Sequence, residues 1–413
     1  MSSKENKDSL SKKRLLVVAR SGLAKKNDVF FANPNEGAFL DELASFFQEI
    51  VLCVNIYKGH DLENYPQNFE AKTYQLDTNN ITIVELKTSS YINFLGKIIQ
   101  YYKRYVAVKN ASKNVDYFFF FSTGYLGILS SIIASISKIP SVVYVGGDWS
   151  DLILFRSNKA NVAKRSILKI YSKFIRTIQD YSRNSANIRL IRGDELFTRY
   201  NRKNSYKLPP MTNIKRENIR KYEQIPTKKE EKIRVLFVGR MEIENGIHDF
   251  INACKIIKDN EAKQIEINIV GQGPIFEEAK ELSTEYGIQA NFLGYIENGQ
   301  ELLNVYRKNS ILVIPVLRAG LPRVLIEGMS QGLSIVASET GGIPHLISHG
   351  ENGFLFQTGN HKEMAESIQF LIDDKDLREK FARAGIETAL SQITDQTAAE
   401  FTAEKICLNL NNL

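Results

Sequence analysis

The chain has 413 residues, which is enough for two domains with full hydrophobic cores, and 43% apolar with 24% charged residues is ordinary for a globular protein. Three widely spaced cysteines and five histidines lack metal-ligand spacing, which fits buried thiols in a reducing cytosol and argues against a dedicated metal site. The net charge of +7 favours anionic partners, but no nucleic-acid recognition motif accompanies it.

Predicted strands alternate with predicted helices through the first half of the chain. Residues 1–13 are polar and are expected to form a disordered tail, and the five apolar residues that follow are too few for a signal peptide. A polar loop that contains Glu36 and Gly37 is expected between the first strand and the first helix. The pattern predicts strands at 15–19, 51–56, 81–86, 117–121, 141–145 and 187–191, and helices at 38–47, 92–108, 125–137 and 195–200. Such alternation predicts a parallel sheet covered on both faces.

Residues 117–137 carry no charge, and this length imitates a membrane span. The run divides internally, because four phenylalanines at 118–121 form a strand-like segment that is followed by a Ser122-Thr123-Gly124 turn. Helical spacing follows from Tyr125. We interpret the stretch as a buried strand and a packed helix.

A basic amphipathic helix is predicted where most of the positive charge is concentrated. Between residues 153 and 187, eight basic residues face the single acid Asp180. The apolar residues recur at helical spacing, and another face is basic; the apolar set is Ile167, Ile170, Tyr171, Phe174 and Ile178. Two interpretations remain open. The helix either packs on the core with its basic face in solvent, or its charge attracts anionic lipid head groups or an acidic acceptor. A basic and aromatic stretch at 97–113 favours a cytoplasmic protein that is peripheral on the inner face of the membrane.

The second half of the chain repeats the alternation after a polar, proline-containing segment. We predict a first domain at 14–202, a linker at 203–231, a second domain at 232–396, and a last helix at 397–413 that packs back on the first domain. The predicted strands of the second domain are 234–238, 265–270, 290–293, 311–314, 334–337 and 353–356. The expected fold class is α/β, with two Rossmann-like domains whose parallel sheets face each other across a ligand cleft.

The stretch at 318–329 has the pattern of a glycine turn that enters a helix, with Pro322 at the first helical position. Such a helix start is suited to an anion, because the amides of Arg323 and Val324 point outward at the positive end of the helix dipole. Glu327 lies further along the helix, where its carboxylate could accept hydrogen bonds from ligand hydroxyls. An amphipathic surface helix with a satisfied glutamate is the alternative.

Other glycine turns follow strands of both predicted domains. Arg240 comes directly after a strand and could bind a phosphate through two parallel hydrogen bonds, or could form a surface salt bridge. The loop Gly271-Gln272-Gly273 lacks the full dinucleotide fingerprint and is weak evidence alone. In the first half, Asp148 ends a strand and is the candidate acid or base, although a turn is the simpler role for it.

These motifs occur in an order that resembles a known family. The resemblance is carried by Phe237-Val238-Gly239-Arg240, Val270-Gly271-Gln272-Gly273-Pro274, Phe292-Leu293-Gly294-Tyr295, the segment 320–329 and Gly341-Gly342-Ile343-Pro344. Together they are similar to the carboxyl-terminal domain of family 4 retaining glycosyltransferases, which have the GT-B arrangement. The resemblance is strong over 233–359 and much weaker in the first half, which faces the acceptor in such families.

The resemblance implies a nucleotide-sugar site without a metal or a cofactor, with a UDP-, GDP- or ADP-sugar as the donor substrate. Arg240 would hold the diphosphate, Glu327 the ribose, and Tyr295 would lie near the base. Gly37 would approach the phosphates from the other domain. The remaining donor-binding positions are Asn245, Gly273, Ala319, Gly320, Leu321, Arg323 and Val324.

Two positions depart from the family pattern. The first of the family's paired glutamates falls on Ala319, which cannot hydrogen-bond the transferred sugar. Asn245 stands where a lysine is usual, so the diphosphate loses a positive charge. One charge-assisted contact is worth about 1.5 to 3 kcal/mol, so activity falls unless Arg318 and Arg323 compensate.

The sequence therefore favours a retaining, metal-independent glycosyltransferase that moves a sugar to a glycan or lipid-linked acceptor in surface polysaccharide biosynthesis. The alternative is a catalytically weakened pseudo-glycosyltransferase that binds a nucleotide sugar or a partner transferase. Ala319 and Asn245 are the observations that motivate this alternative. A nucleotide-sugar epimerase of similar fold has less support, because no acid pair is placed for it.

Overall fold

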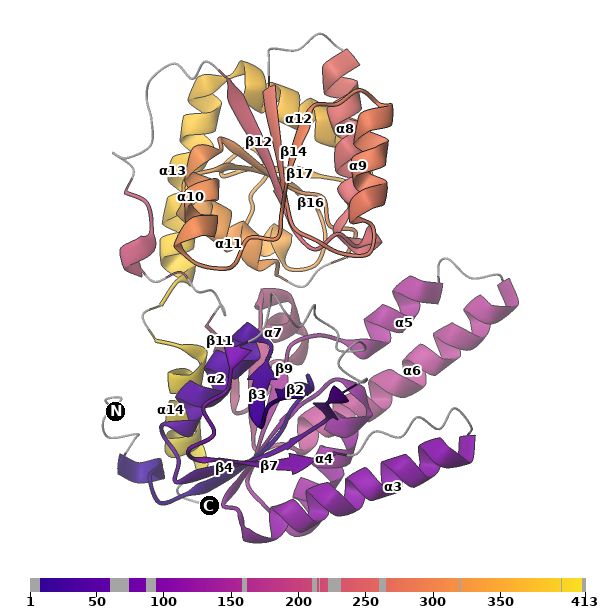
Figure 1. The fold of residues 1–413 in the computed structure, drawn as a ribbon, viewed down its shortest axis with the longest axis vertical. Coiled ribbons are helices and arrows are strands. Elements are labelled where there is room, and N and C mark those ends of the chain that lie inside the picture. Colours follow the sequence, from indigo (N-terminus) through magenta and orange to yellow (C-terminus); the bar gives the residue numbers. More distant parts are fainter. Residues whose placement is uncertain are drawn as a thin grey trace. The chain divides into compact units, whose positions relative to one another are not determined.

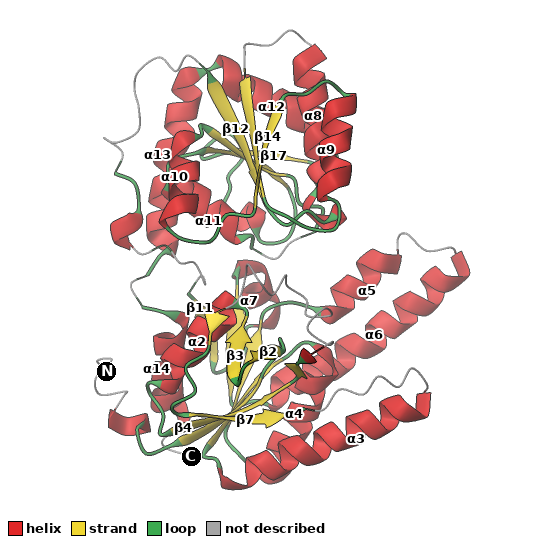
Figure 2. Ribbon diagram, viewed as in Figure 1, coloured by secondary structure: helices red, strands yellow, loops and turns green. Residues whose placement is uncertain are grey.

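The protein forms two compact units (Figure 1), Met1–Leu208 with Gln396–Leu413, and Pro209–Asp395. The computed structural model describes residues 8–59, 74–86, 94–157, 162–209, 214, 216–221, 232–259, 265–318, 321–394 and 396–410. Each unit is built on its own parallel sheet with helices against it, as Figure 2 shows, so the predicted α/β class is confirmed.

The main sheet of the first unit has, among the described residues, seven parallel strands in the order β11-β10-β9-β8-β1-β4-β7. Most of its strands are continuous apolar runs rather than alternating ones, as expected when both faces are covered. The ranges are β1 Arg14–Val18, β4 Glu49–Val54, β7 Ile81–Glu85, β8 Tyr117–Phe121, β9 Ser141–Val145, β10 Ile188–Arg192 and β11 Ser205–Leu208. The strand order reverses between β1 and β8.

The helices of the first unit are α2 Pro34–Ala44, α3 Phe94–Ala111, α4 Gly124–Ser137, α5 Trp149–Ser157, α6 Val162–Ser185, α7 Asp194–Tyr200 and α14 Ala398–Leu410. β8 and α4 confirm that the uncharged run is a buried strand followed by a packed helix. No described helix has the length and apolar character needed to cross a membrane. α14 packs on α2 and β10, and Tyr206 donates its hydroxyl to Asn409 Oδ1 at 2.8 Å.

The prediction of a polar loop directly after the first strand is wrong, because this segment forms a β-hairpin. Asn27 and Asp28 adopt positive φ values of 49° and 61°, which let the chain reverse between two short strands. These strands belong to a small second sheet in the order β5-β2-β3-β6, made of β5 Ile56–Tyr57, β2 Leu23–Lys26, β3 Val29–Ala32 and β6 Tyr74–Gln75.

Three further details of the first unit differ from the expectation. Gly37 is helical rather than in a loop, because α2 already begins at Pro34, where a proline is well tolerated. β11 lies in the segment predicted as linker and forms the edge of the main sheet. Leu10 is buried although it belongs to the predicted tail, and Lys13 donates its amide to the Leu10 carbonyl at 2.9 Å.

The sheet of the second unit has six described parallel strands in the order β14-β13-β12-β15-β16-β17. They are β12 Ile233–Val238, β13 Ile265–Val270, β14 Ala290–Gly294, β15 Ile311–Ile314, β16 Ser334–Ser338 and β17 Phe354–Phe356. Three helices cover one face, α8 Ile247–Asp259, α9 Phe276–Glu285 and α12 His361–Asp373, and three the other, α10 Gln300–Lys308, α11 Arg323–Ser330 and α13 Lys375–Gln392 (Figure 1). The order reverses between β12 and β15.

Candidate nucleotide-sugar site

The reversal between β12 and β15 places the candidate site at the carboxyl edge of the second unit's sheet. In open parallel sheets, ligands bind outside the carboxyl ends of the strands, at the point where the strand order reverses. The loop that follows β12 carries Arg240, and the loop that follows β15 leads into α11. The sequence-predicted residues on these two loops are therefore brought to one edge of the sheet.

Close backbone contacts fix the loops at this edge. Met241 donates its amide to the Gln272 carbonyl at 3.0 Å, which joins the loop after β12 to the loop after β13. A Cβ at Gly273 would lie 2.4 Å from the Met241 carbonyl oxygen. Gly246 has a φ of +74°, and a Cβ there would lie 1.8 Å from the Pro315 oxygen. These glycines therefore allow neighbouring loops to touch, and Gly273 has a packing role that does not require a ligand.

Arg240 is held loosely at the rim of this edge. Its side chain is 71% exposed and pairs with Glu242 Oε1 at 2.8 Å. An exposed pair of this kind contributes little to stability, so the guanidinium can exchange the carboxylate for a phosphate at small cost. Asn245 donates its side-chain amide to the Arg240 carbonyl at 2.8 Å. The residue that replaces the family's lysine therefore braces the arginine's backbone.

The start of α11 is held by the neighbouring strand and glycine loop. Pro322 is the N-cap of this helix rather than its first residue, with Leu325 donating its amide to the Pro322 carbonyl at 3.2 Å. Ser338 donates its hydroxyl to the Val316 carbonyl at 2.6 Å, and Gly342 lies directly against Leu321. The first amides of a helix have no acceptor within the helix, so this fixed start is suited to an anion.

Arg323, at the first position of α11, lies among three other polar side chains. Burial raises the pKa of Tyr295, Tyr306 and Glu327, and the positive charge of Arg323 partly opposes this rise in each of them. Tyr306, on α10, is fully buried and donates its hydroxyl to Glu327 Oε2 at 2.9 Å. Three of the predicted donor-binding residues thus form one cluster with a tyrosine that the prediction did not include.

The Glu327 carboxyl is buried, and its burial raises its pKa above the ordinary value of 4.5. The charge of Arg323 and the hydrogen bond from Tyr306 act in the opposite direction but do not cancel the effect of burial. A single described donor therefore leaves the carboxylate under-solvated. Hydroxyl groups of a ligand would supply further hydrogen bonds to it.

Tyr306 is not among the site residues that the sequence predicted. The available signal was chemical. A buried tyrosine hydroxyl needs a partner, and Glu327 is a buried acid in the helix that follows the next strand.

The other predicted site residues differ in where they lie. Ala319 and Gly320 are outside the described residues, whereas Val324 lies in the first turn of α11. Gly37 belongs to the first unit, where a Cβ would lie 2.4 Å from the Tyr74 ring. Close packing against Tyr74 accounts for this glycine without a ligand.

Asp148, the candidate acid or base, sits in a closed hydrogen-bond network in the first unit. Its Oδ1 accepts the Ser150 amide at 2.9 Å and the Ser150 hydroxyl at 2.6 Å. Its Oδ2 accepts the Tyr200 hydroxyl and lies 3.5 Å from Arg183 Nη2. Burial alone would raise the Asp148 pKa, but the hydrogen bonds from Ser150 and Tyr200 and the charge of Arg183 lower it below 3.8. The carboxylate is therefore ionised and fully engaged within the fold.

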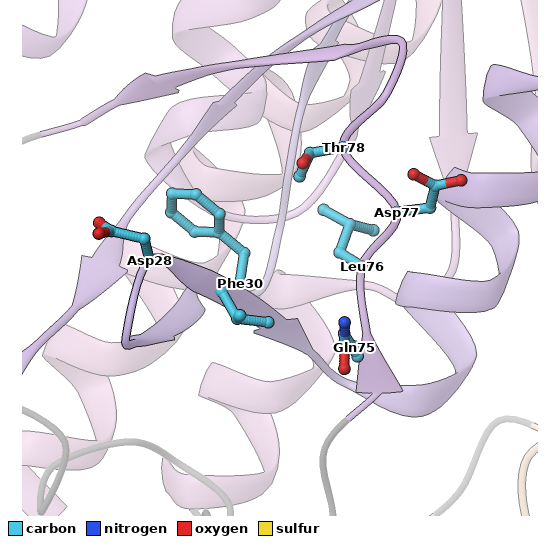
Figure 3. Close-up of a pocket in the computed structure, with 7 residues that line it drawn as sticks. Asp28, Phe30, Gln75, Leu76, Asp77 and Thr78 are labelled. Carbon is cyan, nitrogen blue, oxygen red and sulfur yellow. The ribbon is translucent and has the colours of Figure 1, made fainter.

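A separate hollow of about 330 Å³ lies beside the small sheet of the first unit. Figure 3 shows the ring of Phe30 on one side of it and the segment 75–78 on the other. Asp28 stands at its edge and pairs with Lys25 at 2.8 Å. No residue of the predicted site lines this hollow.

Comparison with known proteins identifies the second unit. The model of the family described as glycosyl transferases group 1 matches residues 218–388. This match covers most of the second unit, which is similar to this family over that length. Sulfoquinovosyl transferase SQD2 of Arabidopsis thaliana is 32% identical over 160 residues, 38% of this chain and 30% of that protein. The capsular polysaccharide biosynthesis glycosyltransferase CapM of Staphylococcus aureus is 25% identical over 160 residues, 39% of this chain and 42% of that protein. The matched region thus spans less than half of either relative.

A solved structure extends the likeness in fold to the first unit. The Anabaena protein Alr3699/HepE, in complex with UDP and glucose, is similar over 97% of this chain and 100% of its own, with a TM-score of 0.63 and 16% identity. At this identity the likeness concerns the fold alone. The predicted GT-B class, with two Rossmann-like units, is confirmed.

Proposed function

We propose that the protein is a retaining glycosyltransferase of family 4, which transfers a sugar from a nucleotide diphosphate donor to a glycan or lipid-linked acceptor. Surface polysaccharide biosynthesis is the process that suits it. The observation that carries the proposal is the cluster of Arg323, Glu327 and Tyr306 at the start of α11, beside the reversal point of the sheet. It combines a site for an anion with a buried acceptor for hydroxyl groups.

The diphosphate, the ribose and the base of a nucleotide diphosphate sugar each have a counterpart among the residues at this edge of the sheet. The diphosphate would lie against the first amides of α11, with the guanidinium of Arg240 neutralising its charge. The ribose hydroxyls would donate to Glu327, whose Oε2 already accepts the Tyr306 hydroxyl. The ring of Tyr295, at the end of β14 and near Arg323, would lie beside the base.

In the proposed reaction, the bond between the anomeric carbon and the diphosphate oxygen breaks while the acceptor hydroxyl attacks from the same face. The acceptor proton passes to the departing diphosphate oxygen, so configuration is retained. Arg240, Arg323 and the positive end of α11 stabilise the developing negative charge without a metal. Asp148 takes no step in this scheme, because its oxygens are already occupied by Ser150 and Tyr200.

Nucleotide release from a panel of UDP-, GDP- and ADP-sugars, measured with and without membrane extract as the source of acceptor, tests the transfer. We expect acceptor-dependent release of one nucleoside diphosphate and an α-configured product from an α-configured donor. The matched control is Glu327→Ala, which should lower release for the same sugar. An inverted product would overturn the retaining mechanism.

Asn245 gives a specific reason to keep the weakened pseudo-glycosyltransferase as a second candidate. Its amide is engaged with the Arg240 carbonyl and adds no positive charge to the diphosphate site. Binding of a nucleotide sugar with no release for any acceptor would favour this candidate over the enzyme. Release at a slow but acceptor-dependent rate would favour the enzyme.

A further inference from the structure

Helix α6 buries several polar side chains and exposes large apolar ones. Its side facing the first unit carries Gln179, Ser182 and Arg183, which are all buried together with Ile175. Its outer side carries large apolar side chains, with Ile170 71% exposed and Phe174 60% exposed. The sequence pattern had left a core-facing apolar stripe open as one interpretation. The structure excludes it for these residues, because the apolar stripe points to solvent.

Polar contacts explain why this orientation is fixed. Gln179 donates to the Ser122 carbonyl at 3.4 Å, and Ser182 donates its hydroxyl to the Gly127 carbonyl at 3.3 Å. Arg183 Nη1 pairs with Asp180 at 3.0 Å, and its guanidinium lies 4.0 Å from the centre of the Tyr200 ring. Rotating the helix to bury Ile170 and Phe174 would expose these polar groups or leave them buried without hydrogen-bond partners. The exposed apolar stripe is therefore a stable feature of the unit.

Helices α3 and α4 extend the same surface. α4 packs against both α3 and α6, and the three helices lie on one side of the unit in Figure 1. The α3 helix packs Val108 into the core and also buries Arg104, which donates to Asn55 Oδ1 at 3.0 Å, whereas its Tyr102 is 67% exposed. We call this surface the α3–α4–α6 face; its exposed apolar residues are Ile98, Ile99, Tyr101, Tyr102, Ile132, Ile136, Ile167, Ile170, Tyr171, Phe174 and Tyr181.

The charge of this face is almost entirely positive. The α3 sequence has no acid, and α6 has only Asp180. Both helices also carry exposed basic residues; they are Lys97, Lys103, Lys109, Lys164, Arg165, Lys169 and Lys173. Apolar surface rimmed by cations, with tyrosines between them, matches the interface of a bilayer with anionic head groups.

We propose that the first unit docks on an anionic lipid membrane through the α3–α4–α6 face, with α6 lying in the plane of the interface. The 24 residues of α6 extend for about 36 Å, long enough to lay several apolar turns against the head-group region. Charge complementarity selects this occupant. A second copy of the face would set cation against cation, and a nucleic acid would leave isoleucines such as Ile170 in water. The inference deepens the proposed function by placing its lipid-linked acceptor at the docked unit.

Sedimentation with vesicles provides the test. One set contains phosphatidylcholine with about one third phosphatidylglycerol, and the other contains phosphatidylcholine alone. We expect the full chain to bind the anionic set, with affinity that falls as salt rises, because exposed charges are screened. Failure of the wild-type chain to sediment with anionic vesicles at low salt would overturn the proposal.

Two variants locate the contact. Lys169→Glu with Lys173→Glu should weaken anionic-vesicle binding about tenfold or more, and Ile170→Ser with Phe174→Ser should weaken it even in low salt. All four side chains are exposed, so folding should be unaffected. The matched control is Lys280→Glu with Lys362→Glu, the same charge change on exposed positions of the second unit, which should bind vesicles like the wild type. Equal binding by the α6 variants and the wild type would overturn the assignment.

Other occupants and the proposed function give distinct results. A dimer in analytical ultracentrifugation that Ile170→Ser with Phe174→Ser dissolves, without vesicle binding, would show that a second copy covers the face. Oligonucleotide binding without vesicle binding would show a nucleic acid instead. Glu327→Ala should keep vesicle binding and lose donor affinity, so each proposal can fail without the other.

Discussion

Two buried carboxylates, one in each unit, differ in what surrounds them. Asp148 follows a strand of the first sheet and accepts hydrogen bonds from Ser150 and Tyr200 beside Arg183, and its pKa is lowered. Glu327 lies in the helix after a strand of the second sheet, has one described donor in Tyr306, and its pKa is raised. A carboxylate saturated within the fold is a structural element, whereas an under-solvated one has capacity for a ligand. Position at a strand end alone does not distinguish the two.

The largest expected effect is on the stability of the first unit. Asp148→Asn removes the buried opposite charge beside Arg183, which then keeps only its pair with the half-exposed Asp180 among the described residues, and breaking a buried pair costs up to about 3 to 5 kcal/mol. Chemical denaturation followed by circular dichroism measures the free energy of unfolding. Because the folded pKa of Asp148 is lowered, its stabilisation is present above about 3.8 and is lost as the pH falls through the folded value. The difference in the free energy of unfolding between the variant and the wild type should therefore become smaller in acid. A difference that stays constant with pH would contradict an ionised Asp148 in the folded protein.

Arg240→Ala should weaken donor binding by about tenfold or more, because the diphosphate loses a charged contact. A tenfold loss corresponds to about 1.4 kcal/mol of binding free energy. Calorimetric titration of the donor measures it. Glu242→Gln serves as the control, since it frees the arginine from its ion pair and should not weaken binding. An unchanged affinity for Arg240→Ala would remove this residue from the site.

Asn245→Lys should tighten donor binding by about twofold to thirtyfold. The new charge adds an attraction of about 1.5 to 3 kcal/mol, which exceeds the roughly 1 kcal/mol of the neutral hydrogen bond to Arg240 that is lost. The same titration measures the change. Asn245→Ala separates the two contributions, because it removes the bond without adding charge and should bind more weakly than wild type.

The smallest expected effect is a pH-dependent gain of stability in Glu327→Gln. Because the folded pKa of Glu327 is raised above 4.5, the wild type loses stability as the pH rises from 4.5 through the folded value. The variant cannot ionise and escapes this loss, while its amide oxygen can still accept the Tyr306 hydroxyl. Thermal unfolding should show equal stability near pH 4 and a more stable variant at pH 7. A wild type that is more stable at pH 7 would contradict the raised pKa.

The sequence predicted the elements that are set by continuous local patterns. The strands of both main sheets apart from β11, and the start of α11, follow from apolar runs, glycines and Pro322, which act within a few residues. The hairpin around Asn27 was missed because its strands are short and its turn depends on two non-glycine residues at positive φ. A sequence pattern this short does not distinguish a hairpin from a loop.

The site was predictable only where its chemistry is local to one motif. Arg240, Arg323 and Glu327 came from motif order, but the Tyr306 contact joins α10 to α11 and needs the tertiary fold. The sequence likewise did not determine whether the apolar stripe of α6 faces the core or the solvent. Helical spacing defines two faces, and only the buried contacts of Gln179 and Arg183 decide which of them turns inward.

Calorimetric titration of the panel of nucleotide sugars into the wild type, Glu327→Ala and Asp148→Asn tests the central claim most directly. The account predicts that one donor binds the wild type, that Glu327→Ala weakens it by about tenfold or more, and that folded Asp148→Asn binds it like the wild type. Equal donor affinity in Glu327→Ala and the wild type would contradict the account, because the buried carboxylate would then have no part in binding the donor.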